Sequence, residues 1–246
     1  MHHLCKRPVS RPHTSPALYE TSPCQPLRDI AETPALMQSS SEGRYELMTK
    51  SQFIALEGID GSGTTTQLTQ IAEALTERGR VVTQTMEPSR GPIGTRIRDI
   101  LRGEEKTPPD SLALLFAADR LDHLQREIVP ALERGEAVLS DRYLISSLAY
   151  QSLHVELPFI EMINARARKP DLSILLKICP KEAAKRRATR GGDAEIFDDL
   201  DLQEKISQAY DKAFERNDLG PTAIVDASAN ISDVTTAILS AIDSLQ

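Results

Sequence analysis

The stretch FIALEGIDGSGTTTQ, residues 53–67, constrains the fold of this chain more than any other. Phe53–Leu56 is apolar and predicts a short buried strand, and the residues after the glycines predict an amphipathic helix. Gly58, Gly61 and Gly63 allow positive φ angles and a close approach of the backbone to a ligand. The N–H groups of such a turn point inward beside the positive end of a helix, so the stretch predicts a cradle for phosphate.

The charge that usually accompanies such a loop is missing. The phosphate-binding pattern G-x-x-x-x-G-K-[ST] is met by Gly58, Gly63 and Thr65, but Thr64 occupies the lysine position. The Thr65 hydroxyl has the right spacing to reach Mg²⁺, although threonine is also an ordinary residue at a helix start. Thr64 contributes its backbone N–H to the cradle and cannot extend an ammonium group to a phosphate.

Two carboxylates, Glu57 and Asp60, flank this glycine loop (Gly58–Thr65). A carboxylate alone would repel a phosphate, so both make chemical sense there if they act through Mg²⁺ or orient a hydroxyl group. The alternative for Asp60 is a turn residue that hydrogen-bonds its own backbone. Glu57 is equally compatible with a structural and a functional role.

Strand-like and helix-like segments alternate from Gln52 onward. We expect further strands at 80–85, 137–140, 171–178 and 223–225, and helices at 65–78, 93–101, 111–133, 180–190, 202–216 and 231–245, with helical stretches up to 168. This alternation predicts an α/β fold of three layers, a five-stranded parallel sheet with helices on both faces, in one domain of residues 51–246. The apolar run at 171–178 suits a central strand. We expect Cys179, the next residue, to lie in this strand as well. The long helix should falter at Pro130.

Composition narrows the class of protein. The chain has 246 residues and a formal net charge of −7, so broad binding to nucleic acid or to a membrane surface is not expected. No apolar run approaches the roughly 18 to 20 residues that a membrane span needs. Cys5, Cys24 and Cys179 lack metal-site spacing, and their odd number suggests reduced thiols in the cytoplasm.

Residues 1–50 are rich in Pro and Ser and lack apolar periodicity, so we expect a disordered N-terminal extension. Lys6, Arg7 and Arg11 precede the first acidic residue, which leaves an organelle transit peptide open as an alternative. Met48 lies just before the first strand, so a start codon assigned too far upstream is a third reading.

Two further groups of residues could act in a site at the carboxyl edge of the sheet. Asp141 and Arg142 end a buried strand, where Asp141 could hold Mg²⁺ through water and Arg142 could bind a phosphate with two N–H groups. The alternative is a structural ion pair. Phe116 and Arg120 lie four residues apart in the long helix and could contact a base and its phosphate, or be a core residue and a surface partner of the residues around Asp119.

Three arginines, Arg186, Arg187 and Arg190, end a predicted helix that runs into Gly191 and Gly192. Such an arrangement could be a lid that folds over phosphate, or simply a solvated basic helix end. Candidate polar groups of a pocket, which could equally be packing residues, are Tyr150, Gln151 and Tyr210.

Taken together and in this order, these residues resemble the thymidylate kinase family. The matching stretches are FIALEGIDGSGTTTQ, MEPSRGPIGTRIRDIL, LLFAADRLDHL, LSDRYLISSLAYQ and RRATRGGDAEIFDDLDLQEKISQAY. They span Gln52 to Leu245, and DRY-x-x-SS-x-AYQ downstream of F-x-x-DR is fairly specific. The N-terminal extension has no counterpart in the family.

The resemblance implies a P-loop NTPase fold that transfers the γ-phosphate of MgATP to dTMP, in a cytoplasmic homodimer with helix 111–133 as a plausible interface. The implied ATP contacts are Gly58, Ile59, Asp60, Gly61, Ser62, Gly63, Thr64, Thr65 and Thr66. Mg²⁺ would be organised by Asp60, Thr65 and Asp141.

The resemblance also implies an acceptor site. The implied dTMP contacts are Glu87, Pro88, Phe116, Arg120, Asp141, Arg142, Ser147, Tyr150 and Gln151. Phe116 would stack on thymine, Arg120 would donate to its carbonyl edge, and Arg142 would bind the phosphate. The implied catalytic residues are Asp60, Arg142, Arg186 and Arg190, the last two in a lid at about 186–198.

Thr64 is the departure from the family, which normally has lysine there. Losing one such electrostatic group costs roughly 3 to 4 kcal/mol, or about 10²- to 10³-fold in rate. We expect a lid arginine or a second cation to substitute. The alternatives are a non-catalytic nucleotide-binding pseudokinase, a deoxynucleoside kinase of the same fold, whose acceptor lacks a phosphate for Arg142, and a partner-switch protein.

Overall fold

The computed structural model describes residues 51–190 and 199–245, except for the side chain of Arg190. Its five strands are all parallel and follow the order β2-β3-β1-β4-β5. The strands are β1 (Gln52–Glu57), β2 (Val82–Met86), β3 (Ala137–Asp141), β4 (Leu172–Lys177) and β5 (Thr222–Asp226). The predicted five-stranded parallel sheet is confirmed, and the strand that leads into the glycine loop lies at its centre.

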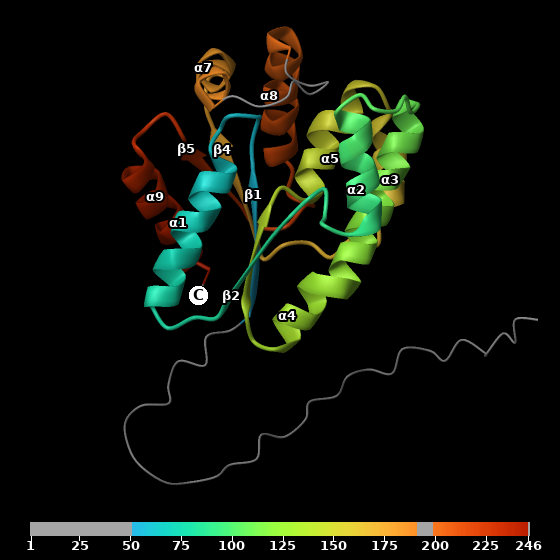
Figure 1. Ribbon diagram of the computed structural model, residues 1–246. Coiled ribbons are helices and arrows are strands. Elements are labelled where there is room, and N and C mark those ends of the chain that lie inside the picture. The colour runs from blue at the N-terminus through green and yellow to red at the C-terminus, as the bar shows by residue number, and fades with distance from the viewer. Residues whose placement is uncertain (1–50, 191–198, 246) are drawn as a thin grey trace, which may run out of the picture. The chain divides into compact units, whose positions relative to one another are not determined.

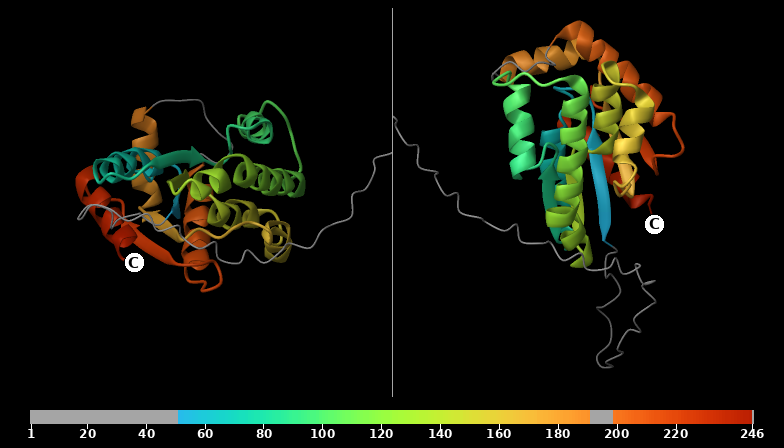
Figure 2. Two further views of the ribbon diagram at one scale, coloured as in Figure 1. Left: turned by 90° about the horizontal axis from the view of Figure 1, so that it is seen from below. Right: turned by 90° about the vertical axis from the view of Figure 1, so that its right-hand side faces the viewer.

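Helices cover both faces of the sheet (Figures 1 and 2). One face carries α1 (Thr64–Glu77) and α9 (Ile231–Asp243), and the other carries α2 (Pro92–Leu101), α3 (Pro109–His123), α4 (Val129–Glu133), α5 (Leu144–Tyr150) and α6 (Leu157–Asn164). Figure 1 shows α7 (Pro180–Arg190) and part of α8 (Leu200–Phe214) beyond the carboxyl ends of the strands, beside the β1–α1 connection. Ligands of open parallel sheets bind at this edge.

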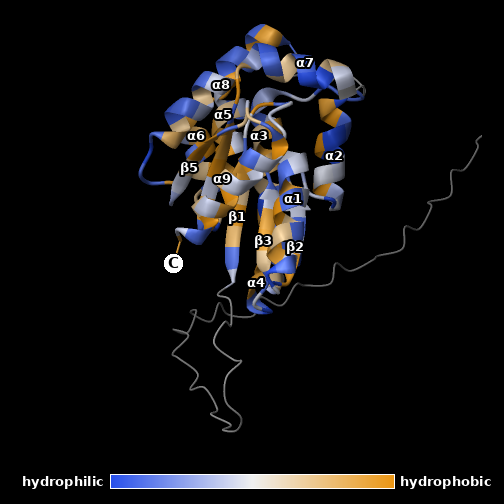
Figure 3. Ribbon diagram, turned by 90° about the vertical axis from the view of Figure 1, so that its left-hand side faces the viewer, coloured by the Kyte–Doolittle hydropathy of each residue, from blue (hydrophilic) through white to orange (hydrophobic). Residues whose placement is uncertain are grey.

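The core lies around the three central strands. Phe53–Leu56 of β1 and Ala137–Leu139 of β3 have no exposed surface, and neither has Ile174 of β4. Figure 3 shows β1 and β3 mostly in the hydrophobic colour, and the helices around them as a mixture of hydrophobic and hydrophilic residues. This packing holds the carboxyl ends of β1 and β3 side by side, which places the glycine loop next to Asp141.

The predicted long helix, 111–133, is interrupted earlier than expected. α3 ends at His123, a π-helical turn covers Leu124–Ile128, and α4 then begins at Val129. Pro130 has no N–H to donate and its ring crowds the preceding turn, so the disturbance falls before the proline. The helix therefore falters as expected, but in the turn before Pro130 and not at the proline itself. The other predicted helices and strands up to β3 and after β4 lie within about two residues of their expected bounds.

Cys179 does not belong to a buried strand, and that prediction is wrong. β4 ends at Lys177, and Cys179 is exposed just before α7. Its carbonyl oxygen accepts from the N–H groups of Glu182 and Ala183 in the first turn of α7. Pro180 suits the first position of a helix and cannot donate to a strand, so the apolar run passes from strand to helix start at this point.

The expected N-terminal extension, residues 1–50, and residues 191–198 of the expected lid lie outside the described residues. Within 51–190 and 199–245, no helix combines the length and the apolar character that crossing a bilayer requires.

Candidate active site

The glycine loop joins β1 to α1 at the carboxyl edge of the sheet. Gly61 (φ +88°) and Gly63 (φ +97°) adopt left-handed backbone conformations, and Gly63 is the N-cap residue of α1. A Cβ atom on Gly61 would lie 2.4 Å from the carbonyl oxygen of Ala183 in α7. Glycine is therefore required there for the turn and also for the close approach of α7.

Thr65 and Asp141 come together from the start of α1 and the end of β3. The Thr65 hydroxyl donates to Oδ2 of Asp141 at 2.6 Å. Oδ1 of Asp141 is buried and has no hydrogen-bond partner within the described part of the chain. Hydroxyl and carboxylate oxygens are the ligands that Mg²⁺ prefers, and an ion would explain the unpaired buried oxygen. These two residues fit the predicted Mg²⁺ site.

Arg142 links the glycine loop to a neighbouring cavity. It follows β3 with φ at 68°, a left-handed conformation that is uncommon for residues other than glycine. Its Nη1 donates to the carbonyl oxygen of Gly58 and its Nη2 to Oδ1 of Asp60, both at 2.6 Å. The guanidinium group also lies 5.1 Å from the centre of the Tyr150 ring. The strained backbone therefore holds a positive charge between the loop and the cavity.

Asp60 is the centre of a hydrogen-bond network, not an isolated turn residue. Besides Arg142, its carboxylate accepts from the Tyr150 hydroxyl at 3.1 Å and from Nε2 of Gln203 at 2.8 Å. These contacts tie α5 and α8 to the glycine loop. Because Asp60 pairs with Arg142 while Thr65 pairs with Asp141, the described side chains do not bring all three predicted Mg²⁺ ligands into one cluster.

Glu57, whose role the sequence leaves open, is completely buried at the end of β1. Its Oε2 accepts from the Ser146 hydroxyl at 2.6 Å and from the Tyr210 hydroxyl at 3.3 Å. Burial raises the pKa of this carboxyl group to about 7, although Ser146 and Arg142 act in the opposite direction. Glu57 therefore holds the Ser146 and Tyr210 hydroxyls at the end of β1, and its carboxyl group titrates near neutral pH.

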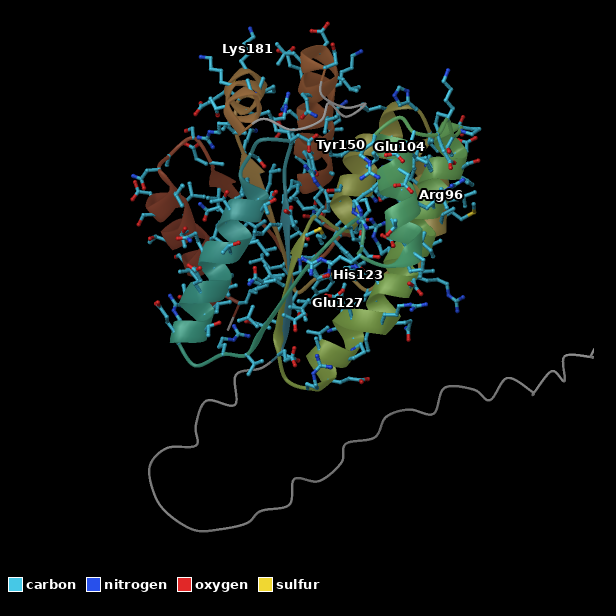
Figure 4. All side chains as sticks on the ribbon, viewed as in Figure 1. Arg96, Glu104, His123, Glu127, Tyr150 and Lys181 are labelled. Carbon is cyan, nitrogen blue, oxygen red and sulfur yellow. The ribbon has the colours of Figure 1, made fainter. Side chains whose placement is uncertain are left out.

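A cavity of about 250 Å³ opens beside Arg142. All predicted dTMP contacts except Asp141 line it, namely Glu87, Pro88, Phe116, Arg120, Arg142, Ser147, Tyr150 and Gln151. Oε1 of Gln151 is buried and has no partner within the described part of the chain. A lining that combines apolar side chains with polar groups suits a small ligand that is recognised by hydrogen bonds. Figure 4 shows Tyr150 on the side of α5 that faces this edge of the sheet.

Arg120 forms the floor of the cavity. It is 1% exposed and donates to Glu87 at 2.7 Å and to the Ser147 hydroxyl at 2.9 Å, with Asn164 as a further partner. Arg120 is therefore not the surface partner of residues around Asp119 that the sequence left open. Asp119 is itself buried and accepts from the backbone and the hydroxyl of a serine in the β2–α2 connection.

The match to a known family model decides which family the chain belongs to. Residues 56–238 match the family model described as thymidylate kinase. This chain belongs to the thymidylate kinase family. A probable thymidylate kinase of Pyrococcus abyssi is 41% identical over 188 residues, which cover 74% of this chain and 91% of that relative.

Two further relatives of this thymidylate kinase family member are similar along nearly their whole length. A probable thymidylate kinase of Pyrococcus horikoshii is 40% identical over 193 residues, covering 76% of this chain and 93% of the relative. One of Methanococcus maripaludis strain C6 is 41% identical over 198 residues, covering 78% of this chain and 94% of the relative.

In this thymidylate kinase family member, the arginines of α7 do not all lie at the donor side of the site. Arg186 donates to the carbonyl oxygen of Ala227 at 2.9 Å and to Glu182 at 3.1 Å. Arg187 instead donates to the carbonyl oxygen of Asp60 in the glycine loop. The side chain of Arg190 lies outside the described residues. The structure thus places Arg187, and not Arg186, against the loop.

Several site residues could not be singled out from the sequence, because their partners are far away along the chain. Ser146 and Gln203 contact Glu57 and Asp60 from α5 and α8. His123 hydrogen-bonds Thr85 at 2.6 Å and lies 3.3 Å from Glu87, and Figure 4 shows it on the side of α3 that faces the sheet. Its position three residues after Arg120, on the same helix face, is the one local signal that could have found it.

Proposed function

We propose that this chain phosphorylates dTMP with ATP, giving dTDP and ADP. The observation that carries this proposal is the position of Arg142, which contacts the Gly58 carbonyl of the glycine loop and also lines the cavity. A cation shared by a phosphate cradle and a neighbouring slot suits an enzyme that brings two phosphorylated substrates together. Membership of the thymidylate kinase family supports the same reaction.

In this reaction, an oxygen of the dTMP phosphate attacks the γ-phosphorus of ATP. The bond from that phosphorus to the β,γ-bridging oxygen breaks, and ADP leaves with the electron pair. No covalent enzyme intermediate is needed, so the chain contributes positioning and charge neutralisation. The glycine loop holds the donor phosphates and Arg142 holds the acceptor phosphate. Asp60 orients Arg142 through their ion pair.

The cavity receives the nucleoside of dTMP. Phe116 stacks on thymine, Pro88 lines the pocket, and Tyr150 lies under the deoxyribose. The polar edge of the base faces Gln151 and the pair of Arg120 with Glu87, which Ser147 extends. The buried unpaired oxygen of Gln151 favours a ligand that donates an N–H group at this point.

Thr65 and Asp141 are our proposed Mg²⁺ contacts, with Asp60 acting through Arg142. The bound ion would neutralise charge on the donor phosphates. The Thr65 hydroxyl and the two Asp141 oxygens lie where the loop meets β3 and would supply oxygen ligands directly or through water.

Two alternatives predict different behaviour at Arg142. A deoxynucleoside kinase would accept thymidine, whose missing phosphate would leave Arg142 with no acceptor to bind. A non-catalytic nucleotide-binding protein would bind both nucleotides and release no ADP.

The deciding experiment is ADP production with ATP, Mg²⁺ and dTMP, coupled to an NADH-consuming assay. We expect turnover of about 1 s⁻¹ or more, as is ordinary for kinases, and no turnover with thymidine. Arg142→Ala should lower kcat/KM for dTMP at least 100-fold. The control is Arg96→Ala, because Arg96 is exposed on α2 and forms an ion pair with Glu105. Equal turnover with thymidine, or tight dTMP binding without ADP release, would contradict the proposal.

We also propose that the chain forms a homodimer through α3 and that it acts in the cytoplasm. Leu114 and Leu121 are seven residues apart on α3 and are 48% and 36% exposed, which favours an apolar contact along this helix. The cytoplasm is proposed because of the odd number of cysteines without metal-site spacing.

A further inference from the structure

We infer that Arg187 of α7 is a catalytic residue that supplies the positive charge missing at the lysine position of the glycine loop. This role rests on the proposed phosphotransferase function and names the residue that makes a loop with Thr64 workable. The charge would act on the donor phosphates while the γ-phosphorus moves from the bridging oxygen of ATP to the oxygen of dTMP. Arg187 stays protonated throughout and forms no bond to phosphorus.

Thr64 cannot supply this charge from its own position. It is the first residue of α1, is 7% exposed, and carries only a hydroxyl and a methyl group beyond Cβ. Phosphoryl transfer spreads negative charge over the oxygens of the moving group, so a fixed cation near the loop lowers the barrier. The cation near the glycine loop therefore has to come from another element of the chain.

α7 is in direct contact with the loop through Gly61. A Cβ atom there would meet the Ala183 carbonyl oxygen at 2.4 Å and Cγ of Arg187 at 3.0 Å. From this position Nη1 of Arg187 donates to the carbonyl oxygen of Asp60. The guanidinium group is thus anchored on the backbone of the loop, and its planar fork matches the geometry of phosphate oxygens.

Two neighbouring arginines with described side chains have other partners or another proposed role. Arg186 binds the Ala227 carbonyl and Glu182, on another side of α7. Arg142 contacts the Gly58 carbonyl, pairs with Asp60 and lines the acceptor cavity, and the proposed reaction already uses its charge for the dTMP phosphate. Figure 1 shows α7 beside the β1–α1 connection, and Figure 4 shows Lys181 at the far side of α7 from the sheet.

The test is a double-mutant cycle between Arg187→Ala and Thr64→Lys, read as kcat for ADP production at saturating substrates. Arg187→Ala should lower kcat by about 10²- to 10³-fold. Thr64→Lys alone should change kcat by less than about threefold, because Arg187 already fills the role. Thr64→Lys combined with Arg187→Ala should recover at least about tenfold, because the new ammonium group replaces the lost guanidinium.

Two further variants separate charge from structure. Arg187→Gln keeps a polar N–H group on an extended side chain but has no charge, and it should be as slow as Arg187→Ala. Lys185→Ala removes an exposed charge from the same helix and should keep at least half of the wild-type kcat. Thermal unfolding of each variant checks that the fold is retained.

A second measurement does not depend on turnover. Calorimetric titration with a non-hydrolysable ATP analogue should show at least fivefold weaker binding to Arg187→Ala, while dTMP affinity changes less than twofold. The inference is overturned if Arg187→Ala keeps more than a third of wild-type kcat, or if a folded Arg187→Ala is not rescued by Thr64→Lys. A wild-type chain that makes no ADP would instead contradict the proposed function, and the analogue titration would still test Arg187.

Discussion

Glu57 shows how a single buried residue gives the protein a pH dependence. Burial raises its pKa from the ordinary value of 4.5 to about 7, so between these pH values the folded chain binds a proton that the unfolded chain has released. The stabilising contribution is complete below about pH 4.5 and is lost as the pH rises through 7. A pKa of about 7 instead of 4.5 corresponds to roughly 3 kcal/mol.

Glu57→Gln should remove this dependence. The amide keeps the shape of the side chain and cannot ionise, so the variant should be more stable than the wild type by about 3 kcal/mol at pH 8.5 and similar to it at pH 5. Urea unfolding at both pH values measures the difference. Equal wild-type and variant stability at pH 8.5 would show that Glu57 ionises in the folded chain as easily as in water.

At the scale of elements, the contact between the glycine loop and α7 depends on the missing side chain of Gly61. Gly79 provides a matched comparison, because it has a similar φ of +82° and a Cβ atom added there would meet nothing within 4 Å. Both positions disfavour a side chain through backbone strain, worth about 1 to 2 kcal/mol. Of these two glycines, Gly61 alone also lies where a side chain would prevent the contact between the glycine loop and α7.

We therefore predict that Gly61→Ala lowers kcat far more than Gly79→Ala, at least 30-fold against less than twofold. The added Cβ pushes α7 and Arg187 from the loop, whereas at Gly79 it adds strain alone. Steady-state ADP assays and thermal unfolding of both variants provide the comparison. Similar kcat values would mean that the approach of α7 does not matter for the reaction.

The elements themselves could be predicted because their signals are local. Apolar periodicity and glycine positions give the strands and helices around the glycine loop, including the start of α1, which lies one residue before the expected position. The π-helical turn at Leu124–Ile128 could not be predicted. A proline indicates that a helix will be disturbed nearby, but it does not indicate which turn will change its hydrogen bonding. The prediction that Cys179 lies in a strand is wrong because an apolar run does not indicate where a strand ends and the next helix begins.

For the whole molecule, the sequence predicts which residues line the cavity but not how they pair. Ordered motifs place Phe116, Arg142 and Tyr150 at one edge of the sheet, and the cavity contains all three. The bond from Thr65 to Asp141 joins residues 76 positions apart, and the bond from Tyr210 to Glu57 joins residues 153 apart. Such pairs depend on the final packing, so motif positions alone could not have assigned Arg187 to the loop in place of Arg186.

The proposed dimer belongs to the same scale. Leu114→Glu combined with Leu121→Glu should convert a dimer to a monomer, because two charges would have to be buried in the apolar contact. Ile224→Glu is the control, since Ile224 is 57% exposed on the edge strand β5, away from α3. Light scattering after size-exclusion chromatography gives the masses. A wild-type chain of monomer mass, or a double variant that stays dimeric, would contradict an interface along α3.

In the proposed reaction, the two contacts of Arg142 would also make the binding of the two nucleotides thermodynamically dependent on each other. The same guanidinium group bonds to Gly58 on the donor side and lines the acceptor cavity. We expect the nucleotide that binds first to change the contacts of that group for the second, and linkage requires the effect on the two affinities to be equal in both directions. An inhibitor built for one pocket will therefore have no single dissociation constant, since its value will depend on the concentration of the opposite nucleotide.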